Sequence, residues 1–490
     1  MRLARSLTAD VCVIGAGAGG AVTAAELAEG GMRVVVLESG PHHDAEDFTA
    51  RPSEMMTRLY RDAGQTLTLG HPPTLLPLGR GLGGTTLVNS GTCFRTPPPV
   101  LERWRREYGL ESLGAHELEP YFERVETALS VTQVTPELAG ENAAVARRGA
   151  ERLGWSHGYL HRNAKGCVGS GVCAFGCPTS AKQHTGITYI PRAIKAGATV
   201  VTGASARRIM VSHGQTTGVS ASTAQGVLTV HAPAVVVAAG TIHTPALLAR
   251  SGLGTSSGQL GRNLSLHPCA AAAARMNHVV DMARGVPQSF YVDEFAREGI
   301  MFEGIAGPPS YVAMSLPLTG RRHAEVMSQY RYLAQFGLMV SDSSRGRVHV
   351  VAGRPVIRYD MNQADLEKFR RGLAYLKRLF EAAGAQEIFL PLAPGASPET
   401  AGRRDLRLMA FHPLGTARAD ADHERGVVNE NLELHDTRGV YVADGAAVPS
   451  ALGVNPQMTI MALATRLAFH LLQTTPRPQP QPQPLNALAG

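Results

Sequence analysis

Long apolar runs and cationic clusters are both missing from this sequence. No segment approaches the roughly 18 consecutive apolar residues that a membrane-spanning helix requires. The opening residues, MRLARSL, run directly into a predicted strand, without the apolar core and cleavage site of a secretory signal peptide. We therefore expect a cytoplasmic protein without a transmembrane segment.

Lysine is also scarce, although the chain is basic overall, with a formal net charge of +7. The lysines among its 47 basic residues are Lys165, Lys182, Lys195, Lys368 and Lys377. The arginines are spread along the chain and form no basic patch of the kind that contacts nucleic-acid phosphates. We interpret the charge as a compositional bias and expect no nucleic-acid partner.

Cysteine is too rare for a disulfide framework, with six residues in 490. Charged residues make up 18% of the chain and hydrophobic residues 44%, a balance that allows a large core and argues against general disorder. The proline- and glutamine-rich tail at 476–490 is the exception, and we expect it to be disordered.

The N-terminal residues have the pattern of a nucleotide-binding βαβ unit. A buried strand over 10–15 is followed by a helix-forming segment over 21–29 and a second apolar strand over 33–37. This second strand ends at Glu38, 18 positions after the last glycine of the intervening motif. Such a strand–helix–strand unit with a terminal carboxylate is typical of dinucleotide-binding proteins.

The glycine motif GAGAGG joins the first strand to the helix, with Gly15, Gly17 and Gly20 at the positions of G-x-G-x-x-G. These glycines let backbone N–H groups and the helix N-terminus approach a pyrophosphate. Glu38 would accept hydrogen bonds from the ribose hydroxyls of an adenosine. The unit predicts FAD or NAD and does not distinguish between them.

Further motifs follow in a fixed order along the chain. They are a glycine-dense loop at 79–89, a strand–turn–helix signature at 235–254, the segment GRNLSLHP at 261–268, and the C-terminal elements HPLGT at 412–416, ADG at 443–445 and NPQMT at 455–459. In this order they resemble the glucose–methanol–choline (GMC) family of FAD-dependent oxidoreductases over almost the whole chain. The resemblance implies an α/β fold, with a Rossmann-like FAD-binding domain and an interleaved α+β substrate-binding domain on an antiparallel sheet.

The domain boundaries follow from the same order of motifs. We expect residues 1–265 and 406–475 to form a discontinuous FAD-binding domain that carries a cysteine-rich loop at 163–180. Residues 266–405 would form the substrate-binding domain, since β-prone runs alternate there with loops and with one amphipathic helix over 366–380.

The resemblance also implies how FAD is held. Glu38 and the first glycine loop would hold the ADP half of the cofactor. The residues expected along the flavin are Gly83, Gly84, Thr85 and Asn89, and those expected at the pyrophosphate and ribityl chain are Asp444 and Gly445. Val88 stands where some family members carry a histidine bonded covalently to the flavin, so a non-covalent FAD is expected.

The implied reaction is oxidation of a CH–OH group of a small-molecule alcohol or sugar, by hydride transfer to flavin N5, to give an aldehyde or ketone. The hydroxyl proton must leave as the hydride departs, and a histidine is suited to accept it. His412 is the expected base, and Asn455 would orient the same oxygen by a hydrogen bond. The alternatives are an oxidase that uses O₂ as acceptor and a non-redox lyase that retains FAD.

Three cysteines are crowded into the glycine-rich segment KGCVGSGVCAFGCP: Cys167, Cys173 and Cys177. Such loops hold iron–sulfur clusters, and a proline commonly follows the last cysteine. The segment is similar to that of bacterial FAD-dependent alcohol and sugar dehydrogenases of this family, which implies a three-iron, four-sulfur cluster that passes electrons to an external carrier. A zinc site completed by His184 or His161, and a loop of metal-free thiols, remain the alternatives.

Overall fold

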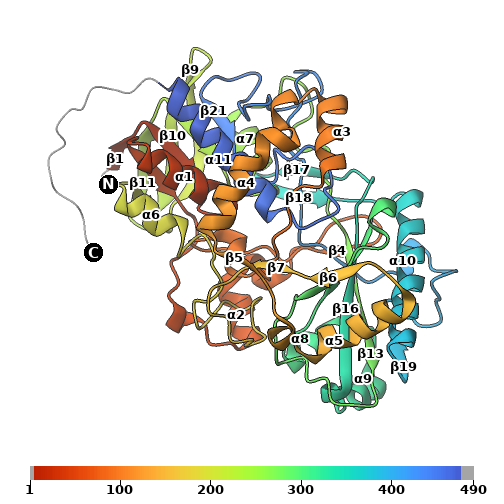
Figure 1. The fold of residues 1–490 in the computed structure, drawn as a ribbon. Helices are drawn as coiled ribbons and strands as arrows, with labels where there is room; N and C mark the ends of the chain where they lie inside the picture. The colour runs from red at the N-terminus through yellow and green to blue at the C-terminus, as the bar shows by residue number, and fades with distance from the viewer. Residues whose placement is uncertain (1–4, 476–490) are drawn as a thin grey trace.

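The computed structural model describes residues 5–475, and the predicted disorder of the tail at 476–490 falls outside the described residues. Two large sheets organise the chain, and the elements of the first sheet come from both ends of the sequence (Figure 1). Within 5–475, no helix is both long and apolar enough to cross a membrane.

The first sheet is entirely parallel, with its strands in the order β21-β12-β2-β3-β8. The strands are β2 (Val11–Ile14), β3 (Val34–Leu37), β8 (Thr199–Val201), β12 (Ala234–Val237) and β21 (Val440–Val442). β2, β3, β12 and β21 are buried at every position, because helices and loops cover both faces of a parallel sheet. The predicted βαβ unit is confirmed, with α1 (Ala18–Glu29) joining β2 to β3.

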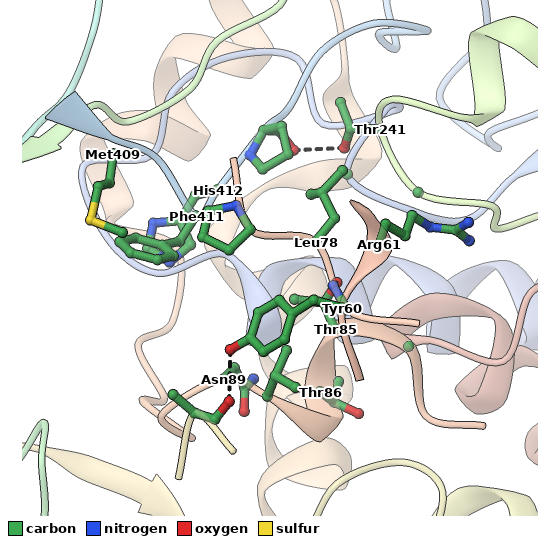
Figure 2. A pocket seen from close by; sticks show the side chains of 18 of the residues that line it. Tyr60, Arg61, Leu78, Thr85, Thr86, Asn89, Thr241, Met409, Phe411 and His412 are labelled. Carbon is green, nitrogen blue, oxygen red and sulfur yellow. Dashed lines mark hydrogen bonds between the residues drawn. The ribbon is translucent and has the colours of Figure 1, made fainter. Parts of the chain in front are cut away.

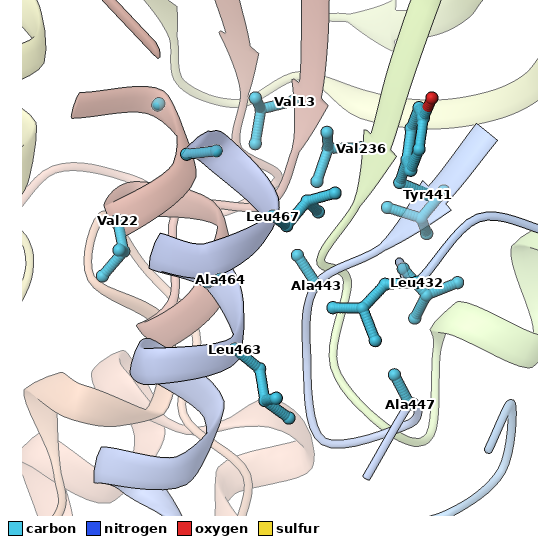
Figure 3. Close-up of a cluster of buried hydrophobic side chains, with 14 of the residues drawn as sticks. Val13, Val22, Val236, Leu432, Tyr441, Ala443, Ala447, Leu463, Ala464 and Leu467 are labelled. Carbon is cyan, nitrogen blue, oxygen red and sulfur yellow. The ribbon is translucent and has the colours of Figure 1, made fainter. Parts of the chain in front are cut away.

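The core of this region is closed by the last helix, α11 (Gln457–Thr474), which packs against α1. Figure 3 shows Leu467 of α11 pointing toward side chains of the sheet, among them Val13 of β2 and Val236 of β12. The chain therefore returns to its starting domain after the second sheet is complete.

The second sheet is almost wholly antiparallel and has eight strands, in the order β4-β20-β13-β16-β15-β14-β6, with β19 also paired to β13. The strands are β4 (Thr74–Leu75), β6 (His157–Tyr159), β13 (Cys269–Arg275), β14 (Phe290–Val292), β15 (Ile300–Gly304), β16 (Leu333–Val340), β19 (Glu387–Phe389) and β20 (Leu408–Met409). Helices α5 (Pro136–Leu153) and α10 (Gln363–Ala382) pack on it. The α/β fold with an antiparallel second sheet is thus confirmed, whereas the exact domain boundaries stay a prediction.

Smaller elements surround these two sheets. One further sheet has the order β1-β11-β10-β9, and two strand pairs are formed by β5 with β7 and by β17 with β18. These strands are β1 (Arg5–Thr8), β5 (Val131–Gln133), β7 (His161–Asn163), β9 (Ser205–Ser212), β10 (Gln215–Thr223), β11 (Gly226–His231), β17 (Arg347–Val351) and β18 (Arg354–Arg358). The other helices are α2 (Pro52–Leu59), α3 (Pro98–Tyr108), α4 (Ala115–Ala128), α6 (Tyr189–Lys195), α7 (Thr244–Ser251), α8 (Pro309–Ser315) and α9 (Gly320–Met327).

The amphipathic helix predicted over 366–380 is confirmed as part of α10. Asn362 caps its N-terminus by accepting a hydrogen bond from the backbone N–H of Asp365 (2.8 Å). Its buried apolar side chains, including Leu366, Phe369 and Leu373, recur at helical spacing and pack against the second sheet.

Candidate active site

A cavity of about 980 Å³ lies between the first and second sheets. One end is lined by the loops that follow β2 and β3, and the other by residues of β13, β15 and β16. Between them lie residues of the second glycine loop and of the C-terminal segments around His412 and Asn455, as Figure 2 shows for Thr85, Asn89 and His412. Motifs that are far apart in the sequence therefore line one and the same cavity.

Two glycines at the loop after β2, Gly15 and Gly20, have no room for a side chain. Gly15 has a φ of +98°, and a Cβ there would lie 2.2 Å from the carbonyl oxygen of Ala238. A Cβ on Gly20 would lie 2.0 Å from the carbonyl oxygen of Gly15, so Gly20 is required by the turn itself. Gly15 and Gly17 line the cavity and leave bare backbone facing it, which suits an anionic pyrophosphate.

Glu38 is buried at the end of β3 and lines the same part of the cavity. Its Oε2 accepts a hydrogen bond from the Ala16 N–H (2.9 Å), and its Oε1 accepts one from the Gly40 N–H (2.7 Å). Oε1 also accepts a hydrogen bond from the Ser39 hydroxyl (3.3 Å). These bonds fix the orientation of the carboxylate, and Oε2 keeps a second lone pair for a ligand hydroxyl.

The second glycine loop touches the first one backbone to backbone. A Cβ on Gly84 would lie 2.8 Å from Gly17 Cα, and both Gly83 and Gly84 have positive φ. Thr85 and Asn89 line the cavity, and Asn89 Nδ2 donates a hydrogen bond to Gln457 at the start of α11. The four predicted residues of this loop, Gly83, Gly84, Thr85 and Asn89, therefore lie in one short segment against the first glycine loop.

Asp444 and Gly445 follow β21 and line the cavity near the loop after β12. Asp444 Oδ2 accepts hydrogen bonds from the Gly240 N–H (2.8 Å) and the Thr244 hydroxyl (2.5 Å), while Oδ1 accepts one from the Ala446 N–H (2.7 Å). Burial nevertheless raises the pKa of Asp444 above its ordinary value. This carboxylate therefore ties the last strand to the start of α7.

His412, Asn455 and Glu303 form a hydrogen-bonded cluster in the lining of the same cavity. Asn455 Nδ2 lies 3.4 Å from His412 Nε2 and donates to Glu303 Oε2 (3.3 Å). Three polar atoms of the cluster are buried without a protein partner: His412 Nδ1, Asn455 Oδ1 and Glu303 Oε1. Because unpaired buried polar atoms are costly, they mark the place where a polar group of a ligand belongs.

The two titratable groups of this cluster have strongly shifted pKa values. Burial, together with the nearby ring of His267, lowers the pKa of His412 to about 3. Burial raises the pKa of Glu303 to about 7, partly offset by the hydrogen bond from Asn455. His412 is therefore neutral near neutral pH, whereas Glu303 is close to its titration midpoint.

Glu303 is the residue of this site that the sequence analysis missed. It lies in the strand IMFEG, where a single carboxylate among apolar, fully buried positions is the one available signal. Gln288 was missed as well: its Nε2 donates to Glu303 Oε2 (2.5 Å), and its Oε1 accepts from the Thr92 hydroxyl (2.8 Å).

His267 was also missed, although its segment was singled out. Its Nε2 accepts hydrogen bonds from the N–H groups of Leu452 (2.8 Å) and Gly453 (3.1 Å), shortly before Asn455. The remaining nitrogen, Nδ1, must then carry the proton and donate to the carbonyl oxygen of His412 (3.4 Å). His267 thereby fixes the backbone of both segments that carry the predicted catalytic pair.

The prediction that Cys167, Cys173 and Cys177 hold an iron–sulfur cluster is not supported. Across residues 5–475, no group of three or more His, Cys, Asp or Glu side chains is arranged to hold a metal ion. The zinc alternative with His184 or His161 is not supported for the same reason. All three cysteines do line one very small cavity, so the loop is folded compactly.

Two of these thiols have hydrogen-bond donors of the protein beside them. Arg162 Nη2 donates to Cys173 Sγ (3.3 Å), and the Lys182 N–H donates to Cys177 Sγ (3.4 Å). Burial alone would raise the pKa of Cys177, but hydrogen bonds from Lys182 and Thr179 and the charge of Lys182 lower it.

The fold and the cavity are those of a protein that binds a dinucleotide cofactor. Residues 56–269 and 342–464 match the N- and C-terminal patterns of the GMC oxidoreductases, and residues 13–45 match an NAD(P)-binding Rossmann-like domain. The chain belongs to the GMC oxidoreductase family. This membership supports FAD as the cofactor, and the side-chain-free cradle at Gly15, Gly17 and Gly84 fits a bound dinucleotide.

Relatives with similar sequences cover nearly all of the chain. An uncharacterised GMC-type oxidoreductase of Mycobacterium tuberculosis is 41% identical over 474 residues, which is 94% of this chain and 75% of the relative. Another, from Sinorhizobium fredii, is 31% identical and covers 94% of both chains. A long-chain-alcohol oxidase of Arabidopsis thaliana is 28% identical over 93% of this chain and 66% of its own length.

Solved structures of lower sequence identity share the fold. A pyridoxine 4-oxidase of Mesorhizobium loti superimposes with a TM-score of 0.76 at 20% identity, covering 94% of this chain and 98% of the other. A formate oxidase of Aspergillus oryzae has a TM-score of 0.73 at 16% identity, with coverage of 95% and 98%. At these identities the likeness establishes the architecture only.

Proposed function

We propose that this protein oxidises the CH–OH group of an alcohol to an aldehyde or ketone with non-covalently bound FAD as the oxidant. The observation that carries the proposal is the cluster of His412, Asn455 and Glu303, which lines the same cavity as Glu38 and has unpaired buried polar atoms. An alcohol oxygen is a group of the right size and polarity to meet them.

The FAD site would use residues from four parts of the chain. Glu38 would accept hydrogen bonds from the ribose hydroxyls of the ADP half, and the backbone of the loop with Gly15 and Gly17 would contact the pyrophosphate. Further residues proposed to contact the cofactor are Gly83, Gly84, Thr85, Asn89, Asp444 and Gly445. FAD supplies hydride-accepting chemistry, and the chain supplies position and electrostatics.

His412 and Asn455 would hold the hydroxyl oxygen of the substrate. Both come from X–Pro steps, where the proline disfavours helical backbone at the residue before it, and His267 fixes the adjoining backbone. The sequence predicts His412 as the base that takes the hydroxyl proton.

The cavity walls favour an apolar alcohol over a sugar. Apolar side chains that also line the cavity include Leu75, Ile305, Leu338, Met339, Met409 and Phe411. Two lining residues, Leu67 and Met314, are also 55% and 59% exposed, which places apolar surface at the cavity entrance. A sugar would leave most of its hydroxyls unpaired against such walls, whereas an alkyl chain would gain about 0.8 kcal/mol per buried methylene.

The electron acceptor has two candidates. Oxygen is favoured by the names of several relatives, which are oxidases. It is also favoured because an iron–sulfur cluster that would pass electrons to an external carrier is not supported. An external carrier is the second candidate. The predicted cytoplasmic location stays a prediction.

The test is a screen of primary alcohols of increasing chain length, sterols and sugars with purified flavoprotein. Bleaching of the flavin without oxygen, followed by peroxide release in air, would establish an alcohol oxidase. Bleaching that only artificial acceptors reverse would establish a dehydrogenase. A flavoprotein that no alcohol reduces would refute the proposed oxidation and favour the non-redox lyase.

A further inference from the structure

The arginines that line the large cavity are Arg61, Arg80, Arg250, Arg404 and Arg407. The first three donate hydrogen bonds to Ser39 or Gly353. Within residues 5–475, the guanidinium groups of Arg404 and Arg407 make no hydrogen bond, ion pair or ring contact. Because each guanidinium has five N–H donors and a permanent positive charge, these two groups are available to bind an anion.

The carboxylate between these two arginines in the sequence is held by its own turn. Asp405 Oδ2 accepts a hydrogen bond from the Gly402 N–H (2.7 Å), at the short 3₁₀ helix Arg403–Asp405. The other carboxylates that line the cavity, each hydrogen-bonded to other groups of the chain, are Glu38, Glu303 and Asp444. The charge of the two arginines is therefore not compensated by any carboxylate of the described residues.

Arg407 stands at one end of a row of lining residues that leads to His412. Buried residues alternate with more exposed ones from Leu406 to Phe411. Since alternate residues of an extended segment share a face, Arg407, Met409 and Phe411 form one row in the cavity wall. Arg407 is five residues before His412, so their Cα atoms are at most about 18 Å apart.

The strand pairing places this row beside the cavity entrance. Met409 of β20 pairs with Leu75 of β4, and Leu75 pairs in turn with Leu67, which is 55% exposed. The Arg407 N–H donates to the Pro391 carbonyl (3.1 Å), so the backbone that carries this arginine is fixed. Solvent therefore reaches the exposed guanidinium groups, whereas apolar side chains separate them from His412.

We propose that Arg404 and Arg407 form an anion subsite for the far end of the substrate, which would be a carboxylate or a phosphate monoester. The inference rests on the proposed alcohol oxidation and narrows its substrate class to an alcohol with an apolar stem and a terminal anion. The hydroxyl would lie at His412 and Asn455, the stem along the apolar walls, and the anion at the entrance. A guanidinium binds two oxygens of either anion by parallel hydrogen bonds.

The first experiment uses FAD-loaded wild type and alcohols that share one stem and differ at the far end. They are an n-alkanol, an ω-hydroxy carboxylate, an ω-hydroxyalkyl phosphate and an ω-amino alcohol. We expect kcat/KM of an anionic alcohol to exceed that of the n-alkanol by about 10-fold at low salt, and less at high salt. The carboxylate and phosphate arms show which anion is preferred. Stems too short to reach the entrance from His412 should give no such preference.

The second experiment repeats these measurements on variants of the anion subsite. The double variant Arg404→Gln/Arg407→Gln should lose the preference for an anionic alcohol, and Arg407→Glu should shift it toward the ω-amino alcohol. The loss should appear mainly in KM, because the far end is held equally in the ground state and the transition state. Arg297→Gln is the matched control: this arginine is also exposed but does not line the cavity, so the preference should be retained.

A third measurement does not depend on turnover. Decanoate has a carboxylate and an apolar stem but no hydroxyl to oxidise, and its binding to FAD-loaded protein can be measured by equilibrium dialysis. The double variant Arg404→Gln/Arg407→Gln should raise the Kd of decanoate by about 10-fold, whereas Arg297→Gln should leave it unchanged. Flavin absorbance per protein confirms that each variant keeps its cofactor.

The outcomes separate the anion subsite from the proposed function. Equal kcat/KM for the anionic alcohols and the n-alkanol, or a preference that the double variant retains, overturns the anion subsite while alcohol oxidation stands. Decanoate binding that the double variant leaves unchanged overturns it as well. A wild type that oxidises none of these alcohols, but binds decanoate through the two arginines, overturns the proposed function and supports the anion subsite.

Discussion

Two buried ionisable side chains, Glu303 in the cavity and Lys182 behind the cysteine loop, have opposite hydrogen-bonding environments. Glu303 keeps one oxygen without a partner. Lys182 Nζ donates to three backbone carbonyls, those of Leu87 (2.7 Å), Asn89 (2.7 Å) and Cys173 (2.8 Å), and so uses all three of its N–H bonds. Burial indicates that each group matters, but only the incomplete partner set indicates a ligand.

The complete partner set of Lys182 has a structural meaning. Leu87 and Asn89 belong to the second glycine loop, and Cys173 belongs to the cysteine loop, so one ammonium joins the two loops. Arg162 makes a parallel connection, donating to the Ser90 carbonyl (Nη2, 2.5 Å) and to Cys173 Sγ. The cysteine loop is therefore interpreted as a support for the segment proposed to lie along the flavin.

The largest effect is expected from His412→Ala. This change removes a group that holds the substrate oxygen, so kcat should fall by about 10²–10⁴-fold while FAD stays bound. Steady-state kinetics and flavin absorbance check it. Turnover equal to the wild type would remove His412 from the mechanism and leave the free atoms of this cluster without a catalytic meaning.

Lys182→Met should be next, with a loss of about 3–5 kcal/mol of stability, because three buried carbonyls lose their donor. Urea unfolding measures it, and the FAD content should fall as the second glycine loop loosens. The exposed Lys195→Met is the matched control and should change stability by less than about 0.5 kcal/mol. If Lys182→Met were as stable as Lys195→Met, the proposed structural role of Lys182 would be wrong.

A smaller effect on stability is expected from Glu303→Gln, and its sign depends on pH. Folding raises the pKa of Glu303 to about 7, so between about pH 4.5 and pH 7 the folded protein binds more protons than the unfolded chain. Wild-type stability should therefore fall across this range relative to Glu303→Gln. The difference should approach on the order of 3 kcal/mol at most above pH 7, measured by urea unfolding at several pH values.

The smallest effect is expected from Cys177→Ser. The serine hydroxyl can still accept from the Lys182 N–H, so stability should change by about 1 kcal/mol or less. Iron and acid-labile sulfide assays on protein purified without oxygen should find no stoichiometric cluster. About three irons per flavin would instead show that the cysteine loop holds one.

The sequence predicts the cofactor end of the molecule better than the substrate end. A Cβ at Gly15, Gly20 or Gly84 would collide with backbone, so these positions require glycine, and closely spaced glycines leave a recognisable pattern in the sequence. Glu303 leaves almost none, because its neighbours come from segments far away in the chain and only the assembled sheet places it beside Asn455.

The cysteine loop shows a different limit. Spacing along the chain shows that three thiols are near one another, but it does not show whether their sulfur atoms converge on one point. Here Arg162 and Lys182, neither of which the ligand pattern takes into account, provide the partners of Cys173 and Cys177. Before a metal is assigned to closely spaced cysteines, the hydrogen-bond donors around their thiols must therefore be considered.

The contact between Gly17 and Gly84, together with the position of Asp444 after β21, has a consequence for biosynthesis. The cofactor pocket takes its walls from the beginning and the end of the chain, so a ribosome must release residue 445 before the pocket is complete. FAD would then bind late, after the C-terminal segments of the chain have been synthesised and folded.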